Sequence, residues 1–280
     1  MILEGKKEEE EMIYKRIFLY ENSEDVYMDV YAADKLKDYK RKALLVIPGG
    51  GYAGICANRE GEPITLAFMA KGYNAFVLHY SILGRRVFPA QLIEASMAMK
   101  YIKDHAEEYG IDPEKVYVAG FSAGGHLAGM IGTMWNRKEV YETISMPYGY
   151  NKPAGMILMY PVIQGLEEYS NKDCFYRLLG TETPSIEQLA EVSIEKTVSK
   201  DAVPAYILHT ADDAIVDVKN SLRLAEAYLN QGMTVELHIY PSAPHGIALG
   251  NEITRCGVDG WVDPAIALWV DQAVLWADKM

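Results

Sequence analysis

The sequence predicts one α/β domain of 280 residues, built on a mostly parallel, eight-stranded sheet with helices on both faces. Short apolar runs recur along the chain, stretches with helical spacing lie between them, and glycine or proline marks many of the junctions. The sequence contains no internal repeat, low-complexity tract or domain linker. We therefore expect a single domain over residues 1–280.

The composition is that of an ordinary globular protein and limits the classes of partner. Hydrophobic residues make up 50% of the chain, charged residues 24%, and the formal net charge is −12. An acidic chain repels phosphate backbones, so nucleic acid is not an expected partner. No stretch approaches the ~18 apolar residues of a membrane span, and the first twenty residues lack the apolar core of a signal peptide.

The 3 cysteines are scattered, without the spacing of a disulfide framework or a zinc site. Unpaired thiols are typical of a reducing compartment, and we expect a cytoplasmic protein without a metal site.

Eight strand-like runs account for the predicted sheet. The first two, residues 16–20 and 26–31, are close enough in the chain to form an antiparallel pair. The others are short and almost continuously apolar, which is typical of strands buried on both faces of a parallel sheet. They comprise residues 43–47, 75–80, 116–120, 156–160, 205–210 and 235–240.

Helical spacing separates these runs. Pro63 and Gly72 are expected to bound one helix, and Gly110 with Pro113 to close another. The second helix has an apolar face formed by Leu92, Ala95, Met99 and Ile102. A third helix, ended by Gly232, has an expected apolar face at Leu222, Ala225 and Leu229.

The C-terminal helix is expected to begin with Asp263 as N-cap and Pro264 in the first turn. Trp269 and Trp276 share its apolar face. Packing of this face on the sheet is the preferred prediction. Pairing with a second copy of the chain, which would make a homo-oligomer, is the alternative.

Residues 162–203 interrupt the regular alternation between strand runs six and seven. A long insertion at the carboxyl end of a sheet either forms a small cap over a site or decorates the surface. Thr183-Pro184 or Ser185 can start a helix within it.

The fifth strand run leads into Gly120-Phe121-Ser122-Ala123-Gly124, which matches the pattern G-x-S-x-G. Between a strand and a helix, the serine of this pattern lies on a strained turn that points its hydroxyl into a cleft. The glycines remove Cβ atoms that would collide with the neighbouring strand and helix. A tight turn with a capping serine is the alternative, and the preceding strand favours a nucleophile.

The third strand run leads into Pro48-Gly49-Gly50-Gly51-Tyr52. Consecutive glycines allow backbone N–H groups to turn inward around an anion. A phosphate loop is excluded because no Gly-Lys-Ser/Thr follows and G-x-G-x-x-G is absent from this turn. The loop therefore predicts an oxyanion hole, with Gly50, Gly51 and the N–H of Ala123 as donors.

Asp212 and Asp213 follow the seventh strand run, and His245 follows the eighth. A serine hydroxyl becomes nucleophilic when an imidazole accepts its proton and a carboxylate fixes the tautomer of that imidazole. Asp213 is the preferred acid because a short turn into a helix follows it. Asp212 is the alternative and Asp217 a distant third.

Of the 6 histidines, only His245 lies in a loop directly after a strand. His79, His209 and His238 lie within strand runs, where core or sheet-face positions are expected. His105 lies late in a helix, and His126 is expected to pack locally on the helix after Ser122.

With these motifs in place, the chain resembles the α/β-hydrolase superfamily. Within it, the chain is most similar to small esterases grouped with acetyl-xylan and carbohydrate esterases, near the hormone-sensitive-lipase-like branch. The resemblance extends from Leu44 to the C-terminus. Four stretches carry it, namely residues 47–81, 86–128, 208–232 and 240–249.

The resemblance implies Ser122 as nucleophile, His245 as base, Asp213 as acid, and an oxyanion hole formed by the glycine loop and Ala123. Two positions depart from the family pattern. Pro48 stands where the lipase-like branch usually has histidine, and Asp217 stands where the acid turn commonly has proline.

The implied activity is that of a serine carboxylesterase acting on short acyl esters, including acetylated xylo-oligosaccharides or other sugars, without a metal or organic cofactor. An arylformamidase or small peptidase with the same triad, and a non-catalytic binding module with the same fold, are the alternatives. Tyr52, Phe121 and Tyr148 lie near the predicted cleft, where they would either stack on a sugar ring or belong to the core.

Overall fold

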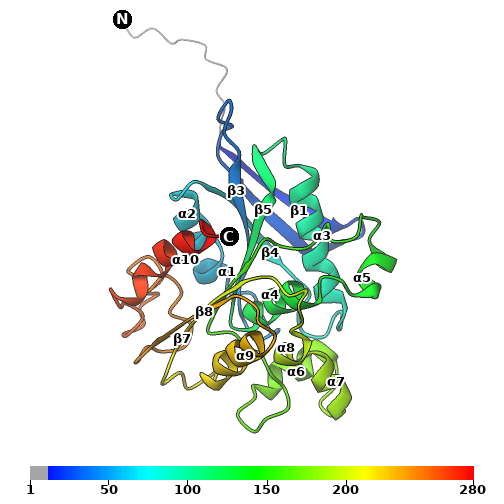
Figure 1. Cartoon of the computed structure of the whole chain (residues 1–280), viewed down its shortest axis with the longest axis vertical. Helices are drawn as coiled ribbons and strands as arrows, with labels where there is room; N and C mark the ends of the chain where they lie inside the picture. The colour runs from blue at the N-terminus through cyan, green and yellow to red at the C-terminus, as the bar shows by residue number, and fades with distance from the viewer. Residues whose placement is uncertain (1–11) are drawn as a thin grey trace, which may run out of the picture.

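The computed structural model describes residues 12–280, and an eight-stranded sheet runs through its centre (Figure 1). The strand order is β1-β2-β4-β3-β5-β6-β7-β8. The expectation that the first twenty residues carry no signal peptide falls largely on residues 1–11, which lie outside the described part.

The sheet is antiparallel at one edge and parallel elsewhere, as the sequence predicts. Strand β1 (Ile13–Tyr20) pairs with β2 (Ser23–Ala32), which pairs in turn with β4 (Tyr73–His79), and both pairings are antiparallel. All remaining neighbours pair in parallel. These strands are β3 (Arg41–Ile47), β5 (Ile111–Phe121), β6 (Met156–Met159), β7 (Ala205–Thr210) and β8 (Val235–Tyr240).

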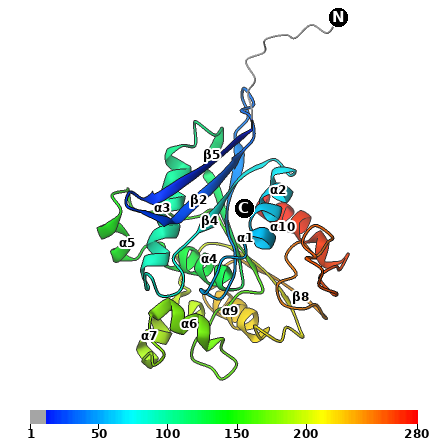
Figure 2. The same ribbon diagram turned by 180° about the vertical axis from the view of Figure 1, so that it is seen from behind.

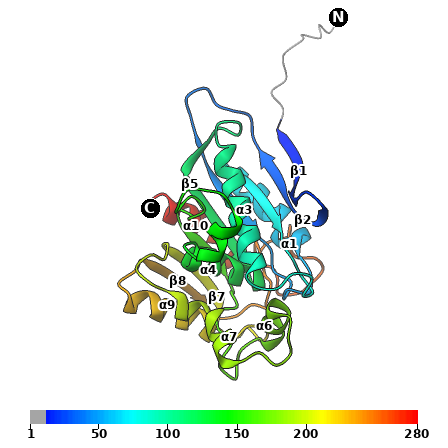
Figure 3. The ribbon, with the colours of Figure 1, turned by 90° about the vertical axis from the view of Figure 1, so that its right-hand side faces the viewer.

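Helices cover both faces of the sheet (Figures 2 and 3). One face packs against α3 (Ala90–Asp104), α4 (Ala123–Met134) and α9 (Lys219–Asn230). The opposite face packs against α2 (Glu62–Met69) and α10 (Trp269–Ala277), which lie side by side. Two further short helices are α1 (Ala57–Glu60) and α5 (Lys138–Thr143).

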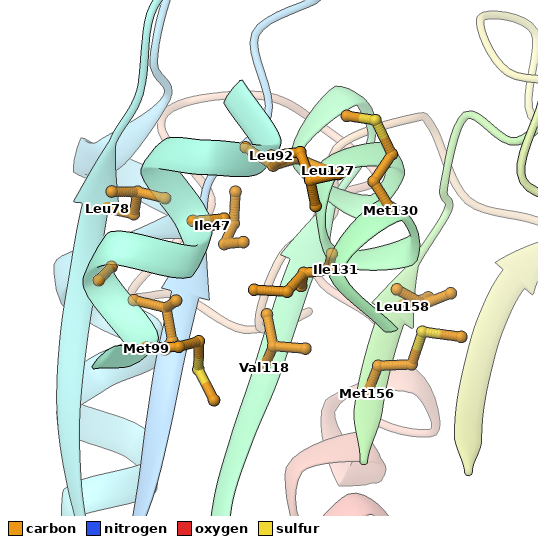
Figure 4. Close-up of a cluster of buried hydrophobic side chains, with 14 of the residues drawn as sticks. Ile47, Leu78, Leu92, Met99, Val118, Leu127, Met130, Ile131, Met156 and Leu158 are labelled. Carbon is orange, nitrogen blue, oxygen red and sulfur yellow. The ribbon is translucent and has the colours of Figure 1, made fainter. Parts of the chain in front are cut away.

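The larger hydrophobic cluster lies between α3, α4 and the sheet (Figure 4). Leu92 and Met99 from α3 and Leu127 from α4 meet strand side chains such as Ile47 and Val118. All five are fully buried. Burial of each such side chain stabilises the fold by about 1.5–3 kcal/mol. This layer therefore fixes α4, which begins directly after Ser122, against the strands.

Two helix predictions need correction. Helix α3 ends at Asp104 rather than at Gly110, because the backbone leaves the helical conformation at His105, and residues 105–110 form turns before β5 begins at Ile111. Ala225 lies on the buried face of α9 as predicted, together with Leu224 and Tyr228, whereas the predicted Leu222 and Leu229 are exposed. Leu224 and Tyr228 lie four residues apart on the face that packs into the core, which turns Leu222 and Leu229 toward solvent.

Asp263 caps the turn that leads into the C-terminal helix, because its carboxylate accepts hydrogen bonds from the backbone N–H groups of Ala265 and Ile266. The helix itself begins later than predicted, with Ala265 and not Asp263 at its N-cap. The first turn is a 3₁₀ helix, Ile266–Leu268, which continues as α10. Trp269 and Trp276 are buried within the chain itself, as the packing prediction expects.

The insertion at residues 162–203 contains three helices, α6 (Lys172–Leu179), α7 (Ile186–Glu191) and α8 (Ile194–Thr197). Ser185 caps α7 through a reciprocal capping box with Gln188. Helices α6 and α7 lie at the end of the molecule opposite to the start of β1 in all three views (Figures 1–3).

Candidate active site

Ser122 lies on a sharp turn between β5 and α4, with φ 52° and ψ −118°. A non-glycine residue in this backbone region is strained and persists only where its surroundings hold it. Here the Ser122 N–H donates to the Met159 carbonyl at 3.0 Å, and its own carbonyl accepts from Val162 at 3.1 Å. Contacts to β6 and the segment after it therefore fix the turn.

The glycines around Ser122 have the steric role that the motif predicts. A Cβ atom on Gly120 would lie 2.3 Å from the carbonyl oxygen of Gly124. A Cβ atom on Gly124 would lie 2.1 Å from the carbonyl oxygen of Ile47. Strand β5, strand β3 and helix α4 thus approach one another as closely as only glycine permits.

His245 joins Ser122 to Asp213. Its Nε2 lies 2.9 Å from the Ser122 hydroxyl oxygen, and its Nδ1 lies 2.7 Å from Asp213 Oδ2. Because an ionised carboxylate only accepts hydrogen bonds, the proton of the neutral imidazole belongs on Nδ1. Nε2 is then the acceptor for the serine hydroxyl, which is the arrangement a general base requires.

Asp213 lies in a buried, hydrogen-bonded environment that favours its charged form. Oδ1 accepts from the N–H groups of Ile215 and Val216, both at 2.9 Å. Burial alone would raise the pKa of Asp213, but its interactions with His209, His245 and the Val216 N–H outweigh burial and hold the pKa well below its usual range. The carboxylate is therefore ionised wherever His245 would act as a base.

Asp212 and Asp217 have different surroundings. Asp212 accepts hydrogen bonds from the Ser242 hydroxyl and, at 3.2 Å, from the Ala243 N–H, so it holds the loop after β8. Asp217 accepts from the Lys219 N–H at the start of α9. Of the three candidate acids, the structure thus brings only Asp213 to the imidazole of His245.

The glycine loop after β3 borders the same cavity as Ser122 and His245. Among residues 12–280, the backbone N–H groups of Gly50, Gly51 and Ala123 have no hydrogen-bond acceptor. The Gly50 carbonyl accepts from the N–H groups of Ala53 and Gly54, which shapes the loop. Unsatisfied donors beside a serine are what a developing oxyanion needs.

Glu60 is a buried charged residue that sequence patterns did not single out. Its Oε2 accepts from the Gly49 N–H at 2.8 Å, and its Oε1 accepts from the Tyr160 hydroxyl at 3.0 Å. The Tyr160 hydroxyl accepts from the Ala248 N–H at 3.1 Å, and the Tyr160 ring packs edge-on against His245, with ring centroids 4.9 Å apart. Glu60 therefore links the glycine loop to the loop that carries His245.

His209 is a second residue whose role the sequence left open. It is buried in β7 as expected, but its Nε2 also lies 3.4 Å from Asp213 Oδ2. Its ring is oriented by the Ser221 hydroxyl at 2.7 Å and the Val216 carbonyl at 2.8 Å. The spacing of four residues between His209 and Asp213 was the only sequence signal for this contact. It is a weak signal, because the contact forms only through the turn that follows β7.

Of the two alternatives for Tyr52, the structure excludes stacking on a substrate and places the ring in the core. Tyr52 is only 1% exposed, and its hydroxyl lies 2.9 Å from His126 Nδ1. His126 is in turn 2.7 Å from the Val192 carbonyl through Nε2, so it bridges distant segments instead of packing locally. Phe121 is also buried in the core, which leaves neither ring free to contact a sugar.

The active-site cavity has a volume of about 280 Å³. The insertion contributes Asn171, Asp173, Cys174 and Arg177 to its lining. Burial raises the pKa of the Cys174 thiol to about 12, so this thiol is protonated at neutral pH and is a poor nucleophile.

Residues 12–280 contain no cluster of three or more His, Cys, Asp or Glu side chains suited to a metal ion. In the same part of the chain, no helix is both long and apolar enough to span a membrane.

This sheet topology, with a serine on the turn after β5 and a histidine after β8, defines an α/β hydrolase. A family model described as BD-FAE matches residues 28–228, and the chain belongs to this family of α/β hydrolases. The resemblance inferred from the motifs is thereby confirmed.

Two curated relatives are similar to most of this chain. Endo-1,4-beta-xylanase B of Butyrivibrio fibrisolvens is 33% identical over an alignment of 248 residues that covers 86% of this chain and 38% of the relative. Acetylxylan esterase of Xylanibacter ruminicola is 32% identical over 213 residues, 75% of this chain and 42% of the relative. The chain thus corresponds to well under half the length of either relative.

Solved structures match over nearly the whole chain. The acetyl ester-xyloside bifunctional hydrolase from Caldicellulosiruptor lactoaceticus has a TM-score of 0.80 at 30% identity, covering 95% of this chain and 96% of that one. MGS-M1, an α/β hydrolase from a deep-sea metagenome library, has a TM-score of 0.78 at 32% identity, covering 96% and 98%.

Proposed function

We propose that the protein is a serine carboxylesterase that removes short acyl groups, with acetylated xylo-oligosaccharides or other acetylated sugars as its substrates. The observation that carries the proposal is the chain of contacts from Ser122 through His245 to Asp213, at 2.9 and 2.7 Å, beside unsatisfied N–H donors. The acetylxylan esterase and acetyl ester-xyloside hydrolase among the similar proteins support a sugar ester as substrate.

In the proposed reaction, the Ser122 oxygen attacks the ester carbonyl while His245 Nε2 takes the hydroxyl proton. The carbonyl oxygen becomes an oxyanion that accepts hydrogen bonds from the N–H groups of Gly50, Gly51 and Ala123. As the tetrahedral intermediate breaks down, Nε2 gives its proton to the leaving alcohol and an acyl-serine remains. A water molecule repeats the sequence and releases the acid, while Asp213 stays ionised and holds Nδ1–H.

The size of the cavity supports a short acyl group. Its volume of about 280 Å³ also has to hold the reacting carbonyl and part of the alcohol. Pockets for drug-sized ligands are typically ~300–1,000 Å³. The cavity lining includes the charged residues Arg59, Asp173 and Arg177, and a long alkyl chain would deprive these groups of water.

Hydrolysis of 4-nitrophenyl acetate, butyrate and octanoate by the wild type and Ser122→Ala tests the proposal. We expect turnover that is fastest with acetate, falls with chain length and is lost in the variant. Equal turnover by both proteins, or none by either, would contradict a serine esterase.

A further inference from the structure

A second cavity lies directly beside the active-site cavity and takes no part in the chemistry above. Its volume is about 570 Å³, twice that of its neighbour. One wall is formed by Leu83 and Gly84, and the other includes Tyr176 and Glu182 from α6 and the turn after it. Asp173 and Arg177 line both cavities, so a ligand that outgrows the first extends into the second.

The walls of this second cavity are tied to the active site and to each other. Arg177 donates from Nη1 to the Gly51 carbonyl at 3.1 Å, which joins α6 to the predicted oxyanion loop. The Leu83 N–H donates to the Tyr52 carbonyl at 2.8 Å, and the Phe88 N–H to the Leu178 carbonyl at 2.9 Å. The cavity is therefore formed before a ligand arrives, which reduces the entropic cost of binding.

The side chains of the cavity match the chemistry of a sugar. The carboxylates of Asp173 and Glu182 accept hydrogen bonds, the Arg177 guanidinium donates them, and Tyr176 offers an aromatic ring. Sugar hydroxyls both donate and accept, so they can satisfy groups of both kinds.

Two other ligand classes fit less well. A long acyl chain would cover the Asp173 and Glu182 carboxylates without giving them hydrogen bonds. An anionic ligand would meet two carboxylates and one guanidinium, and Arg177 already pairs with Asp173 at 3.2 Å. A neutral, polyhydroxylated ligand avoids both costs.

We propose that this second cavity is the subsite for the alcohol side of the ester, binding the sugar residues that adjoin the acetylated one. The inference rests on the proposed function and extends it, because it names the residues that would select an oligosaccharide over a simple alcohol.

Two variants test the subsite without altering the predicted triad or oxyanion hole. In Tyr176→Ala and in Glu182→Gln, we expect KM for acetylated xylotetraose to rise about tenfold, equivalent to about 1.4 kcal/mol of binding. We expect kcat/KM for 4-nitrophenyl acetate to stay within about twofold of the wild type, because this ester is too small to reach the second cavity. Tyr39→Ala and Glu187→Gln, exposed positions outside both cavities, are the matched controls.

Binding of unacetylated xylotetraose to Ser122→Ala, measured by calorimetry, separates failure of the subsite from failure of the esterase. Weaker binding when Tyr176→Ala or Glu182→Gln is added would support the subsite, even if the wild type cleaved no ester. Unchanged binding in both double variants, or unchanged KM in an enzyme that does cleave 4-nitrophenyl acetate, would overturn it.

Discussion

At the scale of single residues, the proposed reactivity of Ser122 depends on which nitrogen of His245 carries the proton. The Asp213 carboxylate accepts at 2.7 Å and so holds that proton on Nδ1. An amide at this position can donate instead of accept, and it would favour the opposite tautomer.

Asp213→Asn is therefore expected to lower kcat for 4-nitrophenyl acetate by about 10⁴-fold with little change in KM. Asp212→Asn is the matched control, because Asp212 contacts Ser242 and Ala243 but not the imidazole. Steady-state kinetics of the two variants give the comparison. Equal losses in both would mean that Asp213 has no special role.

Glu60 is expected to act as a positioning residue, since it holds the glycine loop and Tyr160 together. Burial and the nearby charge of Glu60 raise the pKa of Tyr160, so its hydroxyl stays protonated and keeps donating. Removal of the carboxylate leaves the Gly49 N–H and the Tyr160 hydroxyl without their acceptor in the protein interior.

In Glu60→Ala, we expect kcat for 4-nitrophenyl acetate to fall by up to roughly 10²-fold through misplacement of the oxyanion donors. Glu60→Gln, which keeps one oxygen and the shape, should recover part of this loss. The exposed Glu62→Ala serves as the control. Assays well below the melting temperature of each variant separate positioning from unfolding, and a folded Glu60→Ala with wild-type kcat would refute the role.

At the scale of elements, His126 connects α4 to two segments far away in the chain. Its Nε2–H donates to the Val192 carbonyl, so its Nδ1 accepts from the Tyr52 hydroxyl. This assignment requires a neutral ring, and burial lowers the pKa of His126 to about 4. The segment before α8 and the glycine loop are thus joined through one uncharged imidazole.

The resulting pH dependence has a definite sign. Between the ordinary value of 6.5 and about 4, the unfolded chain binds a proton at His126 that the folded chain does not. The free energy of unfolding therefore falls as pH decreases through this window, by at most about 1.4 kcal/mol per pH unit from this residue. Urea unfolding at pH 7 and 5 should show a smaller decrease for His126→Gln than for the wild type. Parallel decreases would argue against a buried neutral histidine.

Strands β7 and β8 were predicted with their observed boundaries. The expectation that β8 is buried on both faces is wrong, because β8 lies at the edge of the sheet and its apolar residues alternate with Glu236 and His238. Short helices such as α1 were not predicted, since four residues show no helical period. The positions of Ser122, Asp213 and His245 could be predicted because each follows a strand, and parallel strands end at one edge of a sheet. The contact between Glu60 and Tyr160 could not be, because Glu60 lies on the short helix α1, which no pattern in the sequence predicts.

At the scale of the whole molecule, the second hydrophobic layer supports the loop that carries His245. Trp269 packs against Phe68 and Phe121, and its indole N–H donates to the Ala248 carbonyl at 3.0 Å. The layer therefore connects α10 to both α2 and the site.

Trp269→Ala is expected to destabilise the fold by about 3–5 kcal/mol, because it leaves a large cavity and an unpaired carbonyl. Leu275→Ala, on the exposed face of the same helix, should change the free energy of unfolding by no more than about 0.5 kcal/mol. Denaturant unfolding of both variants gives the result. A small effect at Trp269 would show that α10 contributes little to the core.

The measurement that tests the central proposal most directly is covalent labelling with a serine-directed fluorophosphonate, followed by mass spectrometry of the peptides. The geometry of Ser122, His245 and Asp213 predicts a single adduct on Ser122 in the wild type, and much slower labelling in His245→Ala. An adduct on another residue, or none at all, would contradict Ser122 as an activated nucleophile.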